Sequence, residues 1–188
     1  RLDGKEVLLF DPVKLDPSGK SSLSGNAYSR DASIVAVGIQ VAGDELPTQY
    51  IIDSKTGAQI HAPLVQVQGV SWTRDNGVAY IEQRTPLPLF WQKLTLGSPV
   101  KDAPVVHKWA DAKNWGSVSD FEYSPYTLYD IGEGWQQNTL SIARTGSNDS
   151  PRVIFNEKGF SASIQMIGDT IFARTTANSP NGRLLKAS

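Results

Sequence analysis

The fold is decided by a short strand and turn, Val70-Ser71-Trp72-Thr73-Arg74-Asp75-Asn76-Gly77, because the same pattern returns along the chain. The pattern stands earlier as Tyr28-Ser29-Arg30-Asp31 and, more weakly, later as Tyr123-Ser124-Pro125. The Ser or Thr of the turn recurs at intervals of 44 and 51 residues, from 29 to 73 to 124. A repeat of about 40–50 residues with about four strands is typical of propeller blades, which bury their faces by stacking on one another.

Short strand-like runs fill the chain between these turns. Apolar stretches such as 34–39 and 139–143 end at turn-forming residues, and no stretch of about twelve residues carries the apolar stripe of a helix. Val7–Phe10 reads as a further strand, stopped by Asp11-Pro12. We therefore predict an all-β fold of about four four-stranded propeller blades, which form either a minimal propeller or part of a larger one. The predicted blades occupy residues 16–62, 63–111, 112–158 and, incompletely, 159–188, and residues 1–15 form the linker and first strand that lead into them.

Composition excludes several classes of function. The 188 residues include 18 Lys+Arg and 19 Asp+Glu, and the resulting net charge of −1 argues against a nucleic-acid partner. There is no cysteine and only two histidines, His61 and His107, so we predict no metal and no cofactor. The longest apolar runs have four residues, so we predict no membrane span. These features leave a periplasmic and a cytoplasmic location both open.

An ordered series of motifs follows along residues 6–107. It begins with Leu8-Leu9-Phe10-Asp11-Pro12, continues with Asp53 before Thr56-Gly57, and ends with Gln92-Lys93-Leu94 and Leu96-Gly97. In this order, with the strand and turn at 70–77, the motifs resemble the β-propeller of the prolyl oligopeptidase family of serine peptidases. The chain departs from the family at Ala32, where the turn usually has Gly, and at Ala79, where the family usually has an aromatic residue.

The resemblance implies a two-domain parent. In that family an α/β-hydrolase domain carries a Ser-Asp-His triad, and a seven-bladed propeller caps it and admits only short peptides. Seven blades of about 45 residues need about 315 residues, so the resemblance implies that this chain, which opens at Arg1, is a partial β-propeller of about four blades. We expect it to be a fragment of a longer, bacterial-type protein. The expected partners are the hydrolase domain of the same parent and short peptides. Open blade edges also predict self-association.

The chain has no sequence pattern for catalysis of its own, so its link to an enzyme rests on the resemblance. Gly159-Phe160-Ser161-Ala162-Ser163 is the nearest match to the G-x-S-x-G nucleophile elbow, but it lacks the last Gly and an alternating strand follows. His61 and His107 both precede Ser161, which is the reverse of the hydrolase order. We therefore predict no catalytic residue, and Ser161 reads as the start of a strand.

Five aromatic residues are candidates for an interdomain or ligand surface. They are Phe90, Trp91, Trp109, Trp115 and Trp135. The three later tryptophans either form a platform for a sugar or a peptide or pack between blades. Phe90 and Trp91 end a run broken by prolines, which either meets another domain or packs on its own blade.

The carboxylates offer one pair near these aromatics. Asp130 and Glu133 precede Trp135 and are the only candidates for a glycosidase-type pair, whose geometry a sequence does not show. Gly132-Glu133-Gly134 opens no helix and carries no phosphate-binding signal. The second hypothesis for function is therefore a non-catalytic propeller module that binds protein or carbohydrate.

Overall fold

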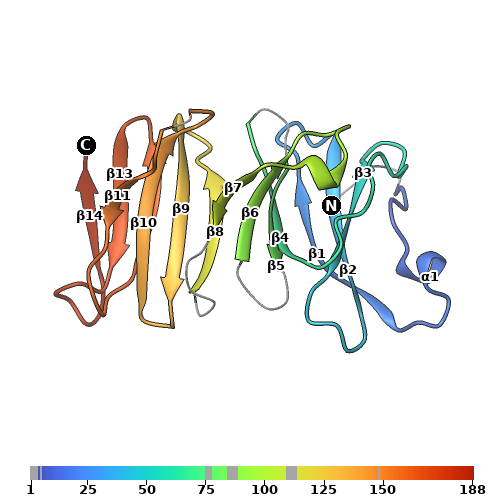
Figure 1. Ribbon diagram of the computed structural model, residues 1–188, viewed down its shortest axis with the longest axis horizontal. Helices are drawn as coiled ribbons and strands as arrows, with labels where there is room; N and C mark the ends of the chain where they lie inside the picture. Colours follow the sequence, from blue (N-terminus) through green and yellow to red (C-terminus); the bar gives the residue numbers. More distant parts are fainter. Residues whose placement is uncertain (1–3, 5, 75–77, 84–88, 109–113, 148) are drawn as a thin grey trace. The chain divides into compact units, whose positions relative to one another are not determined.

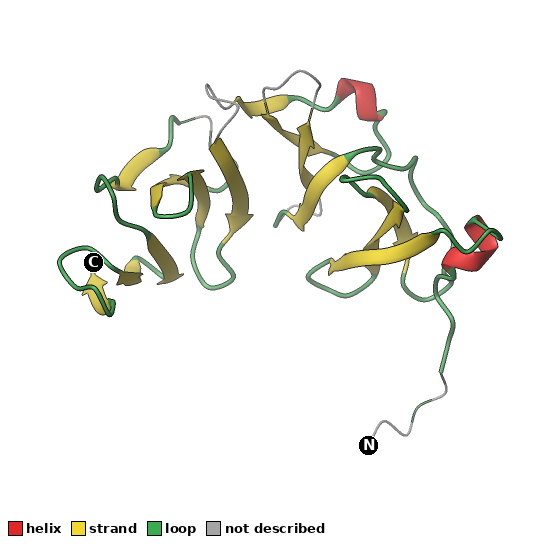
Figure 2. Ribbon diagram, turned by 90° about the horizontal axis from the view of Figure 1, so that it is seen from below, coloured by secondary structure: helices red, strands yellow, loops and turns green. Residues whose placement is uncertain are grey.

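A computed structural model describes residues 4, 6–74, 78–83, 89–108, 114–147 and 149–188, and in these ranges the chain is built from antiparallel β-strands (Figure 1). The described helical segments are one short α-helix, α1 (Pro12–Leu15), and one 3-10 turn, η1 (Val100–Asp102) (Figure 2). No helix among these residues is long and apolar enough to cross a membrane. The predicted all-β class is confirmed.

The described strands form four sheets, and within each sheet the strands lie side by side in sequence order. The first sheet holds β1 (Ser21–Tyr28), β2 (Ile34–Val41) and β3 (Thr48–Asp53), and the second holds β4 (Val67–Trp72), β5 (Val78–Gln83), β6 (Leu89–Leu94) and β7 (Val105–Lys108). The third holds β8 (Asn114–Asp120), β9 (Tyr126–Glu133), β10 (Gln137–Arg144) and β11 (Arg152–Phe155). The fourth holds β12 (Ala162–Ile167), β13 (Thr170–Thr175) and β14 (Arg183–Ala187).

Two of these sheets have three described strands. The first blade was expected to have four, whereas the fourth blade was expected to be incomplete. Where a fourth strand would lie beside β3, the described residues form two isolated bridges, which join Gln49 to Leu64 and Ile52 to Gln59. At the other sheet, β14 is the outer strand, and all five of its residues are exposed.

The segment Val7–Phe10 was predicted as a strand, and the structure shows that this is wrong. It forms no strand, because the apolar side chains of Leu9 and Phe10 pack onto the buried face of the first sheet, and the Phe10 ring lies 5.5 Å from that of Tyr50. Asp11 then caps α1, accepting a hydrogen bond of 3.0 Å from the backbone N–H of Val13. The Asp-Pro pair thus begins a helical turn, because Pro suits the first turn of a helix.

The chain divides into two compact units. The first comprises Arg1–Gln83 with Gln92–Val106, and the second comprises Arg84–Trp91 with His107–Ser188. In the second unit the core lies between the third and fourth sheets. Leu140 and Ile142 of β10 pack with alternate residues of β12. Burial along β12 alternates strictly, with Ala162, Ile164 and Met166 buried, which is the pattern of a strand whose one face is covered by a neighbouring sheet.

Inside each unit, contacts join the first strand of one sheet, or the turn directly after it, to the first strand of the next sheet. In the first unit the indole N–H of Trp72 on β4 donates to the carbonyl of Ala27 on β1 at 2.9 Å. In the second unit Tyr123, in the turn after β8, forms a parallel bridge with Ile167 of β12, and the N–H of Gly168 donates to the carbonyl of Tyr123 at 2.7 Å. Consecutive sheets that are joined beside their first strands in this way are stacked as propeller blades.

The first of the repeated turns shows why its sequence pattern returns. The Asp31 carboxylate accepts hydrogen bonds from the Ser33 N–H at 3.0 Å, the Ser33 hydroxyl at 2.7 Å and the Ser29 hydroxyl at 2.8 Å. These bonds, with that from the Ser33 backbone the largest cause, lower the pKa of Asp31 to about 2. Ala32, which stands where the family usually has Gly, takes a φ of 56°, a strained conformation for a residue with a side chain. Asp75, in the second turn, lies outside the described residues.

Candidate functional site

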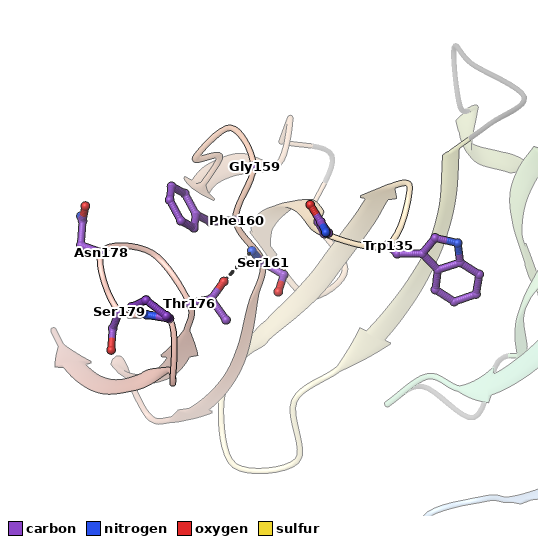
Figure 3. Close-up of a pocket in the computed structure, with 9 residues that line it drawn as sticks. Trp135, Gly159, Phe160, Ser161, Thr176, Asn178 and Ser179 are labelled. Carbon is purple, nitrogen blue, oxygen red and sulfur yellow. Dashed lines mark hydrogen bonds between the residues drawn. The ribbon is translucent and has the colours of Figure 1, made fainter.

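The candidate site lies at one end of the second unit, where three segments meet. They are the turn between β9 and β10, the residues just before β12, and the loop between β13 and β14. Figure 3 shows this end of the unit, with Trp135 on its turn and Ser161 and Thr176 facing each other across the other two segments.

A tryptophan and a glycine form the floor of the site. Trp115 on β8 pairs with Gly132 on β9, and its indole N–H donates to the carbonyl of Gly134 at 2.9 Å. A Cβ atom added to Gly132 would lie 1.9 Å from Cε2 of Trp115, so the indole lies against bare backbone. Trp115 keeps 47% of its surface exposed and thus presents part of its ring to the cavity. Gly132-Glu133-Gly134 therefore serves to seat this indole.

Beside this floor an amide joins the third sheet to the fourth, and a carboxylate of the third sheet bonds the same amide. Asn138 of β10 is buried, and both atoms of its amide bond the backbone of Ala162: Nδ2 donates to the Ala162 carbonyl and Oδ1 accepts from the Ala162 N–H, each at 2.8 Å. Nδ2 also donates to Oδ1 of Asp130 at 2.8 Å. Burial raises the pKa of the half-buried Asp130 carboxyl, while this hydrogen bond opposes the rise.

Two cavities open over these residues. One of about 570 Å³ is lined by Trp135, Phe160 and Ser161 with the loop at 176–180. The other, of about 770 Å³, is lined by Trp115, Asp130, Asn138 and Trp135 from the third sheet and by Arg174 and Arg183 from the fourth. Trp135 borders both cavities and is 100% exposed, so its indole is open to a ligand or partner.

The structure brings together some, but not all, of the aromatic and acidic residues that the sequence suggested as site candidates. Trp115, Trp135 and Asp130 line one cavity. Glu133 does not join them, because it is exposed and its Oε2 accepts from Nε2 of Gln137 at 3.0 Å. Trp109 and the side chains of Phe90 and Trp91 lie outside the described residues, so their proposed role as a surface stays a prediction.

Of the residues considered for catalysis, Ser161 and His61 take part in hydrogen bonds that involve backbone carbonyls. Ser161 directly precedes β12, its carbonyl accepts from the Thr175 hydroxyl at 2.9 Å, and a strand rather than a helix follows it. His61 places Nδ1 and Nε2 each 2.8 Å from a backbone carbonyl, those of Ala62 and Ser98. The side chain of His107 is outside the described set. The described residues contain no group of three or more acidic or His side chains that could hold a metal ion.

Sequence reasoning missed Asn138, Arg174 and Arg183. Asn138 stands in an ordinary strand sequence, Gln137-Asn138-Thr139-Leu140, and its partner Ala162 lies in another sheet. The two arginines read as solvated strand residues, and both are exposed. No local pattern could have shown that these residues share a cavity with Asp130, because that depends on how the two sheets stack.

The sequence of the chain is similar to those of known proteins. A family model described as the prolyl oligopeptidase N-terminal β-propeller domain matches residues 1–188. A prolyl endopeptidase of Elizabethkingia miricola is 25% identical over 202 residues, which cover 98% of this chain and 28% of that protein. A prolyl endopeptidase of Elizabethkingia meningoseptica is 29% identical over 85 residues, 44% of this chain and 12% of the relative.

Solved structures agree on the fold. One from a structural and mechanistic study of two prolyl endopeptidases has a TM-score of 0.90 at 22% identity, covering 99% of this chain and 29% of that one. The chain belongs to the prolyl oligopeptidase family, within its N-terminal β-propeller domain. It spans about 28% of the length of the Elizabethkingia miricola relative, and it is the partial propeller that the resemblance predicted.

Proposed function

We propose that this chain is the substrate-gating part of the propeller of a serine peptidase that cleaves short peptides, and that it has no catalytic activity by itself. The family match across residues 1–188 carries the proposal. The nearest approach to a nucleophile elbow, at Ser161, leads into β12 and not into a helix, which supports a non-catalytic role.

The end of the second unit that carries Trp135 is the surface proposed to meet the hydrolase domain and its peptides. A fully exposed indole bordering two cavities is a large apolar area for a partner to cover. Aromatic side chains beside a few polar groups are also typical of pockets that bind small ligands.

Activity labelling tests the proposal. The 188-residue chain and the longer protein that contains it are each treated with a serine-directed fluorophosphonate and with a chromogenic peptide that contains proline. We expect the longer protein to take up the label and release the chromophore, and the chain alone to do neither. Ser161→Ala in the longer protein should leave the fluorophosphonate labelling unchanged. Labelling of the chain alone at Ser161 would refute the non-catalytic assignment.

Gating is tested with two substrates that carry the same proline-containing sequence. One is a short peptide, and the other presents the sequence in a loop of a folded protein. The longer protein should cleave the peptide and leave the folded protein intact, because a propeller cap excludes bulky substrates. Equal cleavage of both would show that the propeller does not limit access.

The second hypothesis, a module that binds protein or carbohydrate, draws support from the aromatic cavity at Trp115 and Trp135. Binding of a neutral oligosaccharide would quench tryptophan fluorescence of the chain. Such binding, together with a longer protein that takes up no fluorophosphonate, would favour this hypothesis over the peptidase.

A further inference from the structure

We propose that Asp130 anchors a subsite, in the cavity shared by Trp115 and Trp135, for a positively charged nitrogen group of a peptide. The group is either the α-ammonium of the peptide or the side chain of a Lys or Arg within it. This inference rests on the proposed function, because it names the chemistry of the peptide that the same end of the second unit would bind.

The first argument concerns the two oxygens of the carboxylate. Oδ1 accepts from the Asn138 amide at 2.8 Å, and within the described part of the chain Oδ2 has no hydrogen bond or ion pair. An ionised carboxylate accepts about four hydrogen bonds, so most of the capacity of Asp130 is unused. Because Asp130 lines the cavity, a donor that enters there can reach the carboxylate.

The second argument concerns burial. Asp130 is half-buried, and this loss of hydration raises its pKa, since burial disfavours the charged form. A cation that approaches such a carboxylate restores the favourable surroundings that water would give, and the attraction is less screened than between two exposed charges. An ammonium or guanidinium group also donates several hydrogen bonds, which suit the free oxygen.

The third argument concerns the aromatic walls. The face of an indole carries partial negative charge and attracts cations. Trp115 is held in place by its bond to Gly134, and Trp135 stands fully exposed at the rim of the same cavity. A carboxylate that shares a cavity with two indoles is a combination that favours a cationic group over a neutral one.

Arg174 and Arg183 line the same cavity and restrict the charge of the ligand that it can bind. Both are exposed, so water hydrates and screens their charges, and neither pairs with Asp130 among the described contacts. They disfavour a ligand with several positive charges. The inferred ligand is therefore a peptide with one cationic group at Asp130 and a neutral or acidic remainder.

Four versions of one proline-containing peptide test the inference. They carry a free amino terminus, an acetyl cap, a succinyl cap, or an acetyl cap followed by Arg. Each is titrated into the 188-residue chain, with calorimetry and tryptophan fluorescence as readouts. We expect the free-amine or the Arg version to bind about tenfold or more tightly than the acetylated neutral version, as expected for a hydrogen bond between charged groups. Which of the two gains affinity identifies the source of the cation.

Asp130→Asn should abolish that preference while preserving the fold. The new side chain keeps an oxygen that accepts from Asn138, so the bonds to Ala162 remain. Glu133→Gln is the matched control, because it removes the same charge from the same hairpin outside the cavity, and the preference should survive it. An unchanged thermal midpoint verifies that both variants are folded.

The outcomes separate this inference from the proposed function. If the four peptides bind equally well to the unaltered chain, or if the preference persists in Asp130→Asn, the cationic subsite is refuted and peptide binding stands. If the succinylated peptide binds most tightly, the arginines and not Asp130 govern the cavity. If no peptide binds, both the subsite and the peptide-binding role of this end are refuted.

Discussion

Replacing Gly132 by alanine should destabilise the second unit by displacing Trp115. The added Cβ would lie 1.9 Å from Cε2, 2.2 Å from Cζ2 and 2.4 Å from Nε1 of the indole, far inside contact distance. The strand pairing between β8 and β9 fixes both backbones, so the indole must leave its seat. Its bond to the carbonyl of Gly134 is then lost.

The cost can be worked from these contacts. Trp115 buries about half of its surface, about 100 Å² for a side chain of this size, which corresponds to about 2.5 kcal/mol at about 25 cal/mol per Å². The hydrogen bond adds about 1 kcal/mol. Because the released ring keeps some contact elsewhere, we expect the free energy of unfolding to fall by about 2–3 kcal/mol.

Urea unfolding of a double-mutant cycle measures this effect. Gly132→Ala is compared in the unaltered chain and in Trp115→Ala, where the clashing ring is absent. The alanine should cost its full amount in the first background and little in the second. Gly25→Ala is the control, because a Cβ there meets no atom within 4 Å. An equal cost of Gly132→Ala in both backgrounds would refute the clash with Trp115.

Three further predictions follow from the described contacts. Asn138→Ala should lower the free energy of unfolding by about 2–4 kcal/mol in urea, because the buried N–H and carbonyl of Ala162 lose their partner, and an intact midpoint would contradict this. The pKa of Asp31 is lowered to about 2, so the stabilisation by its carboxylate is present above the pKa of the unfolded chain and is lost as pH falls from about 4 towards 2. Asp31→Asn should therefore flatten the acid side of the curve of unfolding free energy against pH. An unchanged slope would show that this turn does not cause the acid dependence. The open edge at β14 should make the chain associate at tens of micromolar in sedimentation, and Leu184→Lys should weaken this; a monodisperse monomer for the unaltered chain would show that the edge is inert.

The fold was predictable because its signals are local and repeated. The turn at Ser29–Asp31 works through hydrogen bonds within a few residues, so its sequence returns wherever the same bend is needed. Strand periodicity is also local, and β12 shows the alternation of buried and exposed residues directly in its sequence. The prediction of a strand at Val7–Phe10 was wrong because its apolar side chains pack on a sheet that the segment does not join. Composition alone does not distinguish a strand from an apolar segment that packs on a sheet.

The candidate site was predictable only in part. Tryptophans near a glycine-rich turn were visible in the sequence, although not whether they are exposed, and two of them, Trp115 and Trp135, line one cavity. The seating of Trp115 on Gly132 was not visible, because it depends on which residues face each other across β8 and β9. The blade boundaries and the roles of Phe90, Trp91 and Trp109 stay predictions.

Asn138 links the stability of the second unit to the chemistry of its cavity. The apolar contacts between β10 and β12 hold the two sheets together but do not fix their exact offset, because dispersion and hydrophobic contacts have little direction. The bonds from the Asn138 amide to the N–H and the carbonyl of Ala162 do fix it, since hydrogen bonds depend on distance and angle. The same amide nitrogen holds Oδ1 of Asp130. The position of the carboxylate in the cavity is therefore set by the contact between the sheets, so a change that shifts one sheet against the other also moves the group inferred to bind the cation.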